Sequence, residues 1–319
     1  MNNTLTTDNR TLATSKITMT KNDNLTVADG IYLFLRKCRV KNLAEHSINS
    51  YEKKLIHFRE FFNEKTLLSS ITADTIDDYI LWLKDNTEAN DITVNSYLRS
   101  LRAFLYYCME CGYISNFKIH LIKAEKKIKE TYTDEELSKL LEKPDVKKCS
   151  FSTFKTWAFI NYCLGTGNRL STALNVHISD IDFDNSIITL RKTKNRKQQI
   201  IPLANSLAIT LKEYLEYRGG EPEDMLFCNE YGEQASERSY QQLVRRYNIK
   251  HGVNRTSIHT FRHTYAKHYI LAGGDIVRLS KLMGHSGIEV TKEYLQMFGK
   301  DLQVDYDRFN PLNRLTGQA

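Results

Sequence analysis

The chain has 319 residues, of which 41% are hydrophobic and 26% charged, and its formal net charge at pH 7 is +7. This length exceeds what one hydrophobic core usually serves, so two domains are expected. The composition is that of a globular protein, and no apolar run approaches the length of a membrane-spanning helix. The positive charge favours a polyanionic partner without identifying one.

The start of the chain and its cysteines indicate the cellular setting. Residues 1–24 are rich in Asn and Thr and lack the apolar run of a signal peptide, which predicts a disordered leader on a cytoplasmic protein. Six cysteines without an export signal indicate reduced thiols. The Cys108-x-x-Cys111 pair has no second ligand pair at metal spacing and lies in an apolar, apparently helical run. Helix packing is therefore preferred over a zinc or redox role.

Residues 25–121 show helical periodicity. Apolar side chains recur at three- and four-residue steps, as in Ile48, Tyr51, Leu55, Phe58 and Phe62. The pattern predicts a bundle of three or four amphipathic helices. The last of them carries Arg99 and Arg102 among its polar positions. These two side chains suit contacts with DNA phosphates, although a solvated surface is an equally good interpretation.

A lysine-rich linker, residues 122–131, follows this bundle and contains Lys123, Lys126 and Lys127. Its charge suits a strap along a duplex, but surface linkers are often basic without binding anything. Thr133-Asp-Glu-Glu136 is a capping box that opens the next helix, so a second domain is expected over residues 132–299. The tail, residues 300–319, has apolar residues that would dock on a neighbouring protomer or fold back on its own domain, and both alternatives stay open.

The second domain is predicted to be helical with one small sheet. Ser186–Arg191 and Gln198–Leu203 are the expected strands, joined by a basic turn. The expected helices are 152–164, 170–176, 206–217, 236–250, 259–272, 276–283 and 288–298. The predicted fold class is therefore mainly α with a small β-sheet, with a helical N-terminal domain and an α+β C-terminal domain.

Six polar residues of this second domain form a set that can bind a phosphodiester and attack it: Arg169, Lys194, His259, Arg262, His285 and Tyr294. Cations stabilise a pentavalent phosphate, histidines move protons or donate to a phosphate oxygen, and a tyrosine can be a covalent nucleophile. The three-residue spacing of His259 and Arg262 puts both on one helix face. Singly, such motifs are common, and a tyrosine beside an apolar stripe is usually a core residue.

Taken together and in order, these motifs resemble those of tyrosine recombinases of the phage-integrase and Xer type. Thr166-Gly-Asn-Arg-Leu-Ser171 resembles the first arginine box of that family. His259-Thr-Phe-Arg-His-Thr264 and Leu282-Met-Gly-His-Ser286, followed by Val290-Thr-Lys-Glu-Tyr294, resemble the second. The resemblance extends further: Lys194 through Ile201-Pro-Leu203 resembles the family's lysine hairpin, and residues 25–121 resemble its core-binding domain. The C-terminal domain is then the catalytic domain.

The resemblance implies a mechanism. Tyr294 would attack the scissile phosphate to form a 3′-phosphotyrosyl bond and release a 5′-hydroxyl. Arg169 and Arg262 would clamp the nonbridging oxygens, and His285 would donate a further hydrogen bond. His259 is the candidate general base.

The basic turn supplies the remaining candidates. By resemblance, Lys194 would protonate the departing 5′ oxygen, with Lys192 and Lys197 as nearby alternatives. Lys192, Arg196 and Lys197 are also candidates for contacts with the DNA backbone.

The family pattern also implies the partners. They are double-stranded DNA, a homotetramer on two DNA sites and an accessory directionality factor, in a nucleoid-associated protein that needs neither metal nor cofactor. The predicted role is integration or excision of a mobile element. Two alternatives stay open: a type IB topoisomerase, which rejoins the same strand, and a DNA-binding regulator without catalysis.

Three positions depart from the family pattern. Asn168 stands where an apolar residue is usual, and Phe261 replaces a leucine. Thr172 stands where a carboxylate often orients the first arginine, and Asp180 or Asp182 is the suggested replacement.

Overall fold

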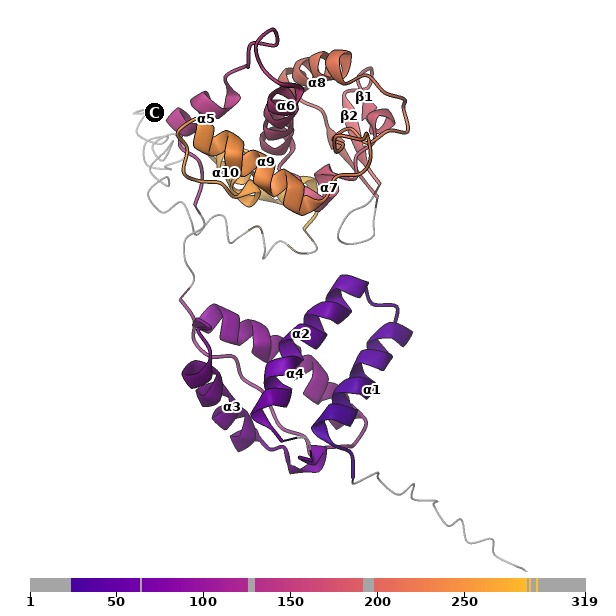
Figure 1. Ribbon diagram of the computed structural model, residues 1–319, viewed down its shortest axis with the longest axis vertical. Helices are drawn as coiled ribbons and strands as arrows, with labels where there is room; N and C mark the ends of the chain where they lie inside the picture. Colours follow the sequence, from indigo (N-terminus) through magenta and orange to yellow (C-terminus); the bar gives the residue numbers. More distant parts are fainter. Residues whose placement is uncertain are drawn as a thin grey trace, which may run out of the picture. The chain divides into compact units, whose positions relative to one another are not determined.

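The structure is a computed structural model that describes residues 24–63, 65–125, 130–191, 198–285, 287 and 291. The chain divides into two compact units, Met1–Lys127 and Ile128–Ala319. Both are mainly helical, and the second contains one small sheet, so the predicted fold class is confirmed (Figure 1). Within the described ranges, no helix combines the length and the apolar character needed to cross a bilayer.

The described part of the first unit is a bundle of four helices, within the three or four that the periodicity predicted. They are α1 (Val27–Val40), α2 (Glu45–Phe61), α3 (Ala73–Asn86) and α4 (Asp91–Glu110), with a short 3₁₀ turn at Leu68–Ser70. The buried face of α4 includes Leu98, Leu101 and Cys108, and burial raises the pKa of the Cys108 thiol to about 12. Cys108 therefore packs in the core, in line with the helix-packing interpretation.

The end of this unit is fixed to α4 by a buried amide. Asn95 is only 5% exposed, and its side chain makes two hydrogen bonds with the backbone of Ile122. Its Nδ2 donates to the carbonyl at 2.9 Å, and its Oδ1 accepts from the N–H at 3.0 Å. Paired donor and acceptor contacts of this kind hold a non-helical backbone against a helix without leaving buried polar groups unpaired.

The second unit surrounds one central helix, α6 (Phe151–Thr166), which is buried on most sides. An all-round apolar helix of this type belongs in the middle of a domain. It packs against α5 (Asp134–Leu141), α8 (Asn205–Arg218), α9 (Glu237–Lys250) and α10 (Ile258–Leu271) (Figure 1). Two short helices complete the described part: α7 (Leu170–Ala173) and α11 (Ile276–Leu282).

The sheet has three antiparallel strands in the order β1-β2-β3. They are β1 (Ile181–Asp182), β2 (Ile187–Leu190) and β3 (Gln199–Pro202), with Leu190 opposite Gln199. The two longer strands match the sequence prediction. The strand β1 was not predicted, because two residues carry no readable alternation of apolar and polar side chains. The basic turn, residues 192–197, lies outside the described residues.

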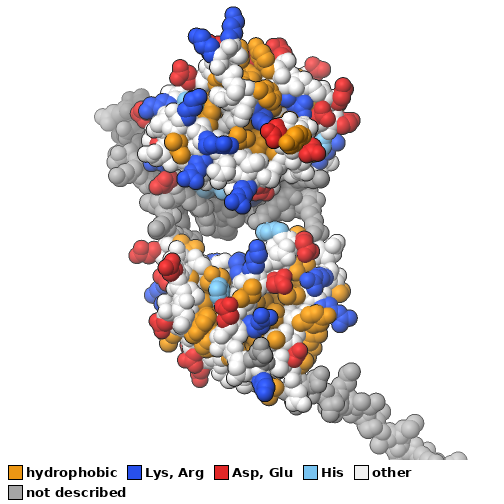
Figure 2. Space-filling model, viewed as in Figure 1, with side chains coloured by type: hydrophobic (Ala, Val, Ile, Leu, Met, Phe, Trp, Pro, Cys, Tyr) orange, Lys and Arg blue, Asp and Glu red, His pale blue; other side chains and the backbone are white. Residues whose placement is uncertain are grey.

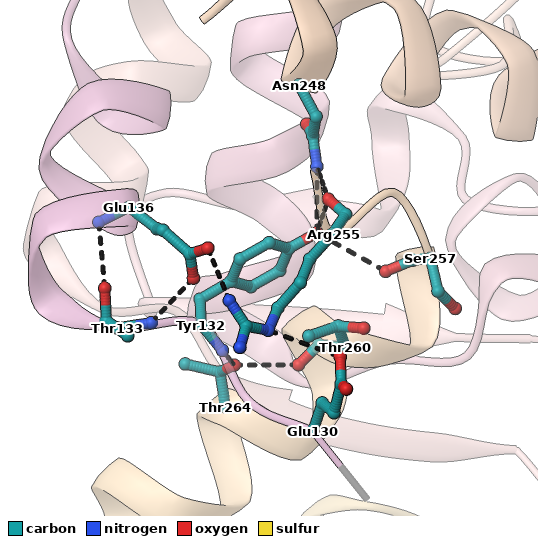
Figure 3. A network of polar contacts seen from close by, with 9 residues as sticks. All are labelled: Glu130, Tyr132, Thr133, Glu136, Asn248, Arg255, Ser257, Thr260 and Thr264. Atoms are coloured by element: carbon teal, nitrogen blue, oxygen red, sulfur yellow. Dashed lines mark hydrogen bonds and ion pairs between the residues drawn. The ribbon is translucent and has the colours of Figure 1, made fainter. Parts of the chain in front are cut away.

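A polar network centred on Tyr132 joins the start of the second unit to the loop before α10 (Figure 3). The Tyr132 N–H donates to Thr264 Oγ1 at 2.9 Å. Its hydroxyl donates to the Arg255 carbonyl at 3.2 Å and accepts from Asn248 Nδ2 at 2.9 Å. The Tyr132 ring lies 4.5 Å from that of Phe261, so the bulkier residue at this family position is used in packing.

The Arg255 side chain extends this network. It donates to Glu136 and forms an ion pair with Glu130 at 3.3 Å. Glu136 also accepts from the Thr133 N–H, while Thr133 Oγ1 accepts from the Glu136 N–H, which confirms the predicted capping box. Together these contacts fix the segment that leads into α10, the helix that carries His259 and Arg262.

Candidate active site

Arg262 is the most completely held of the candidate residues. It lies in the first turns of α10 and is only 5% exposed. Its Nη1 donates to the Gly167 carbonyl at 2.6 Å, and its Nη2 donates to the Met283 carbonyl at 2.8 Å. Gly167 and Met283 are the C-caps of α6 and α11, where the helix dipole is negative. The buried guanidinium is therefore stabilised by two helix ends and fixed in direction.

Gly167 fits this contact because of its backbone. Its φ is +61°, in the left-handed region, and a Cβ there would lie 2.3 Å from Cδ1 of Tyr265. No other residue satisfies both demands without strain. The glycine of the first arginine box therefore closes α6 and presents its carbonyl to Arg262.

Arg169 reaches the same region from the other side. It is the N-cap of α7 and half-buried, and its Nη1 donates to the Gly284 carbonyl at 3.4 Å. Arg169 and Arg262, far apart in sequence, therefore contact adjacent carbonyls of one turn. The preceding Asn168 is buried, and its Nδ2 donates to the Tyr162 hydroxyl at 2.9 Å, which explains a polar residue at a usually apolar position.

His285 completes this cluster. Its Nε2 lies 2.7 Å from Nη2 of Arg262, and its Nδ1 lies 2.7 Å from Oγ1 of Thr291. An arginine can only donate, so Nε2 accepts and the proton of a neutral imidazole is on Nδ1, facing Thr291. Thr291 is fully buried. Through this contact His285 helps to fix the position of the Arg262 side chain. Its expected role as a hydrogen-bond donor to the phosphate stays a prediction.

His259 occupies the first turn of α10, and its ring remains exposed. Partial desolvation lowers its pKa from 6.5, and the positive charges of Arg262 and Arg169 lower it further, against the opposing effect of Glu237. The neutral imidazole is consequently favoured at pH 7, as a proton acceptor requires. His259 lines a groove of about 250 Å³ together with Arg245 of α9 and Leu170 of α7.

The other two catalytic candidates, Lys194 and Tyr294, lie outside the described residues. The structure does describe the ends of the segment that carries Lys194, because Leu190 and Gln199 are paired on adjacent strands. The suggested carboxylate partners of Arg169 make other contacts. Asp180 accepts from Arg191 and from the His177 N–H, and Asp182 accepts from Asn185. These contacts give no support to the idea that either aspartate orients Arg169.

The DNA-contact candidates of the first unit lie on α4. Arg99 is exposed and Arg102 is half-buried. Arg99 lines an open groove of about 270 Å³ between α2 and α4, together with Lys54, His46 and several serines. Lys123 is exposed, whereas Lys126, Lys127, Lys192, Arg196 and Lys197 lie outside the described residues.

Charge alone does not locate a DNA-binding face. On the visible face of each unit, Figure 2 shows basic side chains interspersed with acidic ones. The α2–α4 groove is a candidate for DNA contacts because of its lining residues and not because of a charged patch. Among the described ranges, no group of three or more His, Cys, Asp or Glu side chains is arranged to hold a metal ion.

Several residues around the site were not predictable from the sequence: Gly167, whose carbonyl accepts from Arg262, Gln199, Thr291 and the groove-lining Arg245. Backbone carbonyl contacts leave no side-chain signature. Gln199 and Thr291 belong to residue types that are common everywhere, so only their proximity in space distinguishes them.

Comparison with known proteins accounts for this arrangement. Residues 130–300 match the sequence profile of the phage integrase family, and residues 31–129 match that of the phage integrase SAM-like domain. The chain therefore belongs to the phage integrase family and is a tyrosine recombinase.

Individual relatives agree over most of the chain. A tyrosine recombinase of Pseudothermotoga lettingae is 27% identical over 282 residues, which cover 86% of this chain and 94% of the relative. Two solved structures share the fold. The Tn1549 transposon integrase, in complex with a circular intermediate DNA, has a TM-score of 0.67 and 22% identity, covering 83% of this chain and 94% of that one. A lambda integrase tetramer bound to a Holliday junction has a TM-score of 0.68 and 16% identity, covering 86% and 78%.

Proposed function

We propose that this tyrosine recombinase cleaves and rejoins double-stranded DNA at specific sites through a 3′-phosphotyrosyl intermediate, with Tyr294 as nucleophile. The observation that carries the proposal is the convergence of Arg169, Arg262 and His285 on one turn, residues 281–285. Tyr294 follows His285, the last residue of that turn, by nine positions in the sequence. Two guanidinium groups fixed at one place form a clamp for the two nonbridging oxygens of a phosphate.

The reaction follows from these groups. The Tyr294 oxygen forms a bond to phosphorus as the bond from phosphorus to the 5′ oxygen breaks. His259, held neutral by its surroundings, takes the phenol proton. Lys194 of the basic turn gives a proton to the departing 5′ oxygen, with Lys192 and Lys197 as the alternatives. Since one phosphodiester replaces another, a 5′-hydroxyl of a partner strand reverses the attack without an external energy source.

DNA binding is assigned to both units. The α2–α4 groove offers the exposed Arg99, the half-buried Lys54 and several serine hydroxyl groups, which suit phosphate oxygens. Arg245, beside His259, offers a further phosphate contact next to the reacting centre. Recombination requires two DNA sites and four protomers, in keeping with the tetramer that a lambda integrase of the same fold forms on a Holliday junction.

The proposal is tested with a nicked duplex that traps the covalent adduct. Tyr294→Phe removes the nucleophilic oxygen and leaves the clamp, so we expect no adduct and DNA affinity within about twofold of the parent. The matched control is Tyr231→Phe, because Tyr231 is 78% exposed and lies outside the site. Adduct at normal yield from Tyr294→Phe would exclude Tyr294.

Two further assays separate the alternatives. Strand exchange between two duplex sites identifies a recombinase, whereas relaxation of supercoils without exchange identifies topoisomerase activity. Failure of the parent protein to form any adduct identifies a regulator. Integration or excision of a mobile element stays a prediction, and mapping cleavage sites across the genome distinguishes it from chromosome resolution.

A further inference from the structure

Four consecutive backbone carbonyls at the end of α11 accept hydrogen bonds from side chains of other elements. Arg262 donates a hydrogen bond to the carbonyl of Met283 at 2.8 Å, and Arg169 donates one to the carbonyl of Gly284 at 3.4 Å. The two carbonyls before them belong to Lys281 and Leu282, and both accept from Nε2 of Gln199, at 2.6 and 3.0 Å. One glutamine therefore anchors the same turn that anchors both arginines.

Gln199 is well placed to act as an anchor. It is half-buried, opens β3 and is paired with Leu190 of β2, so its backbone is fixed in the sheet. The last carbonyls of a helix have no partner within it, and a side-chain amide that donates to two of them holds the helix end. The sheet and α11, which are far apart in sequence, are joined at this point.

Gly284 shows how closely Gln199 meets the turn. The φ of Gly284 is +60°, and a Cβ at this position would lie 2.8 Å from Oε1 of Gln199 and 4.0 Å from Nη1 of Arg169. The carboxamide of Gln199 and the guanidinium of Arg169 thus approach the same glycine. A shift of the turn relative to the sheet would change the carbonyl positions that direct both arginines.

We propose that Gln199 is a positioning residue for the phosphate clamp: it holds the Lys281–His285 turn against the sheet and so sets the direction of Arg169 and Arg262. This inference rests on the proposed function, because it presumes that the two arginines act on the scissile phosphate. In this role Gln199 acts through the two arginines and is not itself a catalytic residue.

The test compares two suicide substrates, one with a normal scissile phosphate and one with a methylphosphonate. The methyl group replaces a charged oxygen, so less negative charge develops for the arginines to stabilise. Gln199→Glu keeps the size but cannot donate to the two carbonyls. We expect it to slow adduct formation about tenfold on the phosphodiester and less than about twofold on the methylphosphonate, each relative to the parent protein.

Two variants make the comparison specific. Gln198→Ala changes the neighbouring exposed glutamine and should leave both rates unchanged. Gln199→Lys restores a donor at the same place, near a helix end that favours positive charge, and should recover most of the phosphodiester rate. This recovery separates hydrogen-bond anchoring from a general loss of folding.

Each other outcome overturns the inference. An equal loss on both substrates means that Gln199 only supports folding, and no loss means that the turn needs no anchor. Rescue by a 5′-bridging sulfur, which leaves without a proton, means that Gln199 acts through the general acid instead. In all three cases the parent protein still forms adduct and Tyr294→Phe does not, so the proposed function stands separately.

Discussion

The two basic regions of this recombinase hold their arginines in opposite ways. In the second unit, Arg262 is buried and each end of its guanidinium meets a helix-terminal carbonyl. In the first unit, Arg99 is exposed on α4 beside an open, serine-lined groove. The first arrangement fixes direction before any phosphate arrives, whereas the second lets the side chain adapt. On the proposed function, this difference separates an arginine that acts in catalysis from one that attracts the DNA backbone.

This contrast has an energetic basis. A buried guanidinium costs free energy unless its N–H groups are directed at acceptors, and the fold supplies those acceptors from the ends of α6 and α11. A guanidinium fixed in this way needs no reorganisation when charge develops on a phosphate that it contacts. An exposed arginine has no such cost, but salt screens its contribution.

Arg262→Lys is expected to have the largest effect on the contrast between the buried and the exposed arginine. An ammonium group cannot reach the carbonyls of Gly167 and Met283 at once, so the clamp loses its direction while the charge remains. We expect adduct formation to slow on the order of 10³-fold, with DNA affinity nearly unchanged. Arg246→Lys, an exposed change on α9, is the control. A rate within tenfold of the parent would show that the charge alone suffices.

The pH dependence of cleavage tests whether His259, beside the two arginines, acts as a neutral proton acceptor. Because its pKa is lowered from 6.5, the imidazole stays neutral down to a lower pH than a free histidine does. The acid limb of the adduct rate should be centred below pH 6.5, and well below the lowered pKa the rate should fall about tenfold per pH unit. Single-turnover rates against pH measure this, and His259→Gln should abolish the acid limb. An acid limb centred above pH 6.5 would contradict the assignment.

The smallest effect is expected at the exposed Arg99 of the α2–α4 groove. Arg99→Ala should weaken DNA binding about threefold and reduce the slope of log affinity against log salt by about one, with the cleavage rate of bound DNA unchanged. Arg39→Ala removes an exposed arginine outside the groove and serves as the control. Equal losses in the two variants would mean that the groove has no special role.

The sequence was sufficient for most elements because their signals are local. The capping box at Thr133, the apolar periodicity of α4 and the glycine after it each specify a helix end or face within a few residues. The two-residue strand β1 carries no such signal. Its existence depends on pairing with β2, which is a tertiary property.

The candidate site was predictable only in its side chains. Arg169, Arg262 and His285 are unusual enough in combination to be selected from the sequence, and the structure brings them to one turn. What holds them was not predictable, because carbonyls of Gly167 and Met283 belong to the backbone that every residue shares. The suggestion that Asp180 orients Arg169 gained no support for a related reason: the buried carboxylate pairs with Arg191, the residue that follows β2.

The carbonyl-lined end of α11 has a practical consequence for mutagenesis. Alanine scanning through Lys281, Leu282 and Met283 preserves every main-chain oxygen, so it would record lost packing at the buried positions and overlook the anchoring altogether. Replacing an amide by an ester at the following peptide bond weakens the carbonyl as an acceptor without altering any side chain. Semisynthesis of that kind, rather than conventional substitution, is suited to a site in which backbone carbonyls hold the arginine side chains.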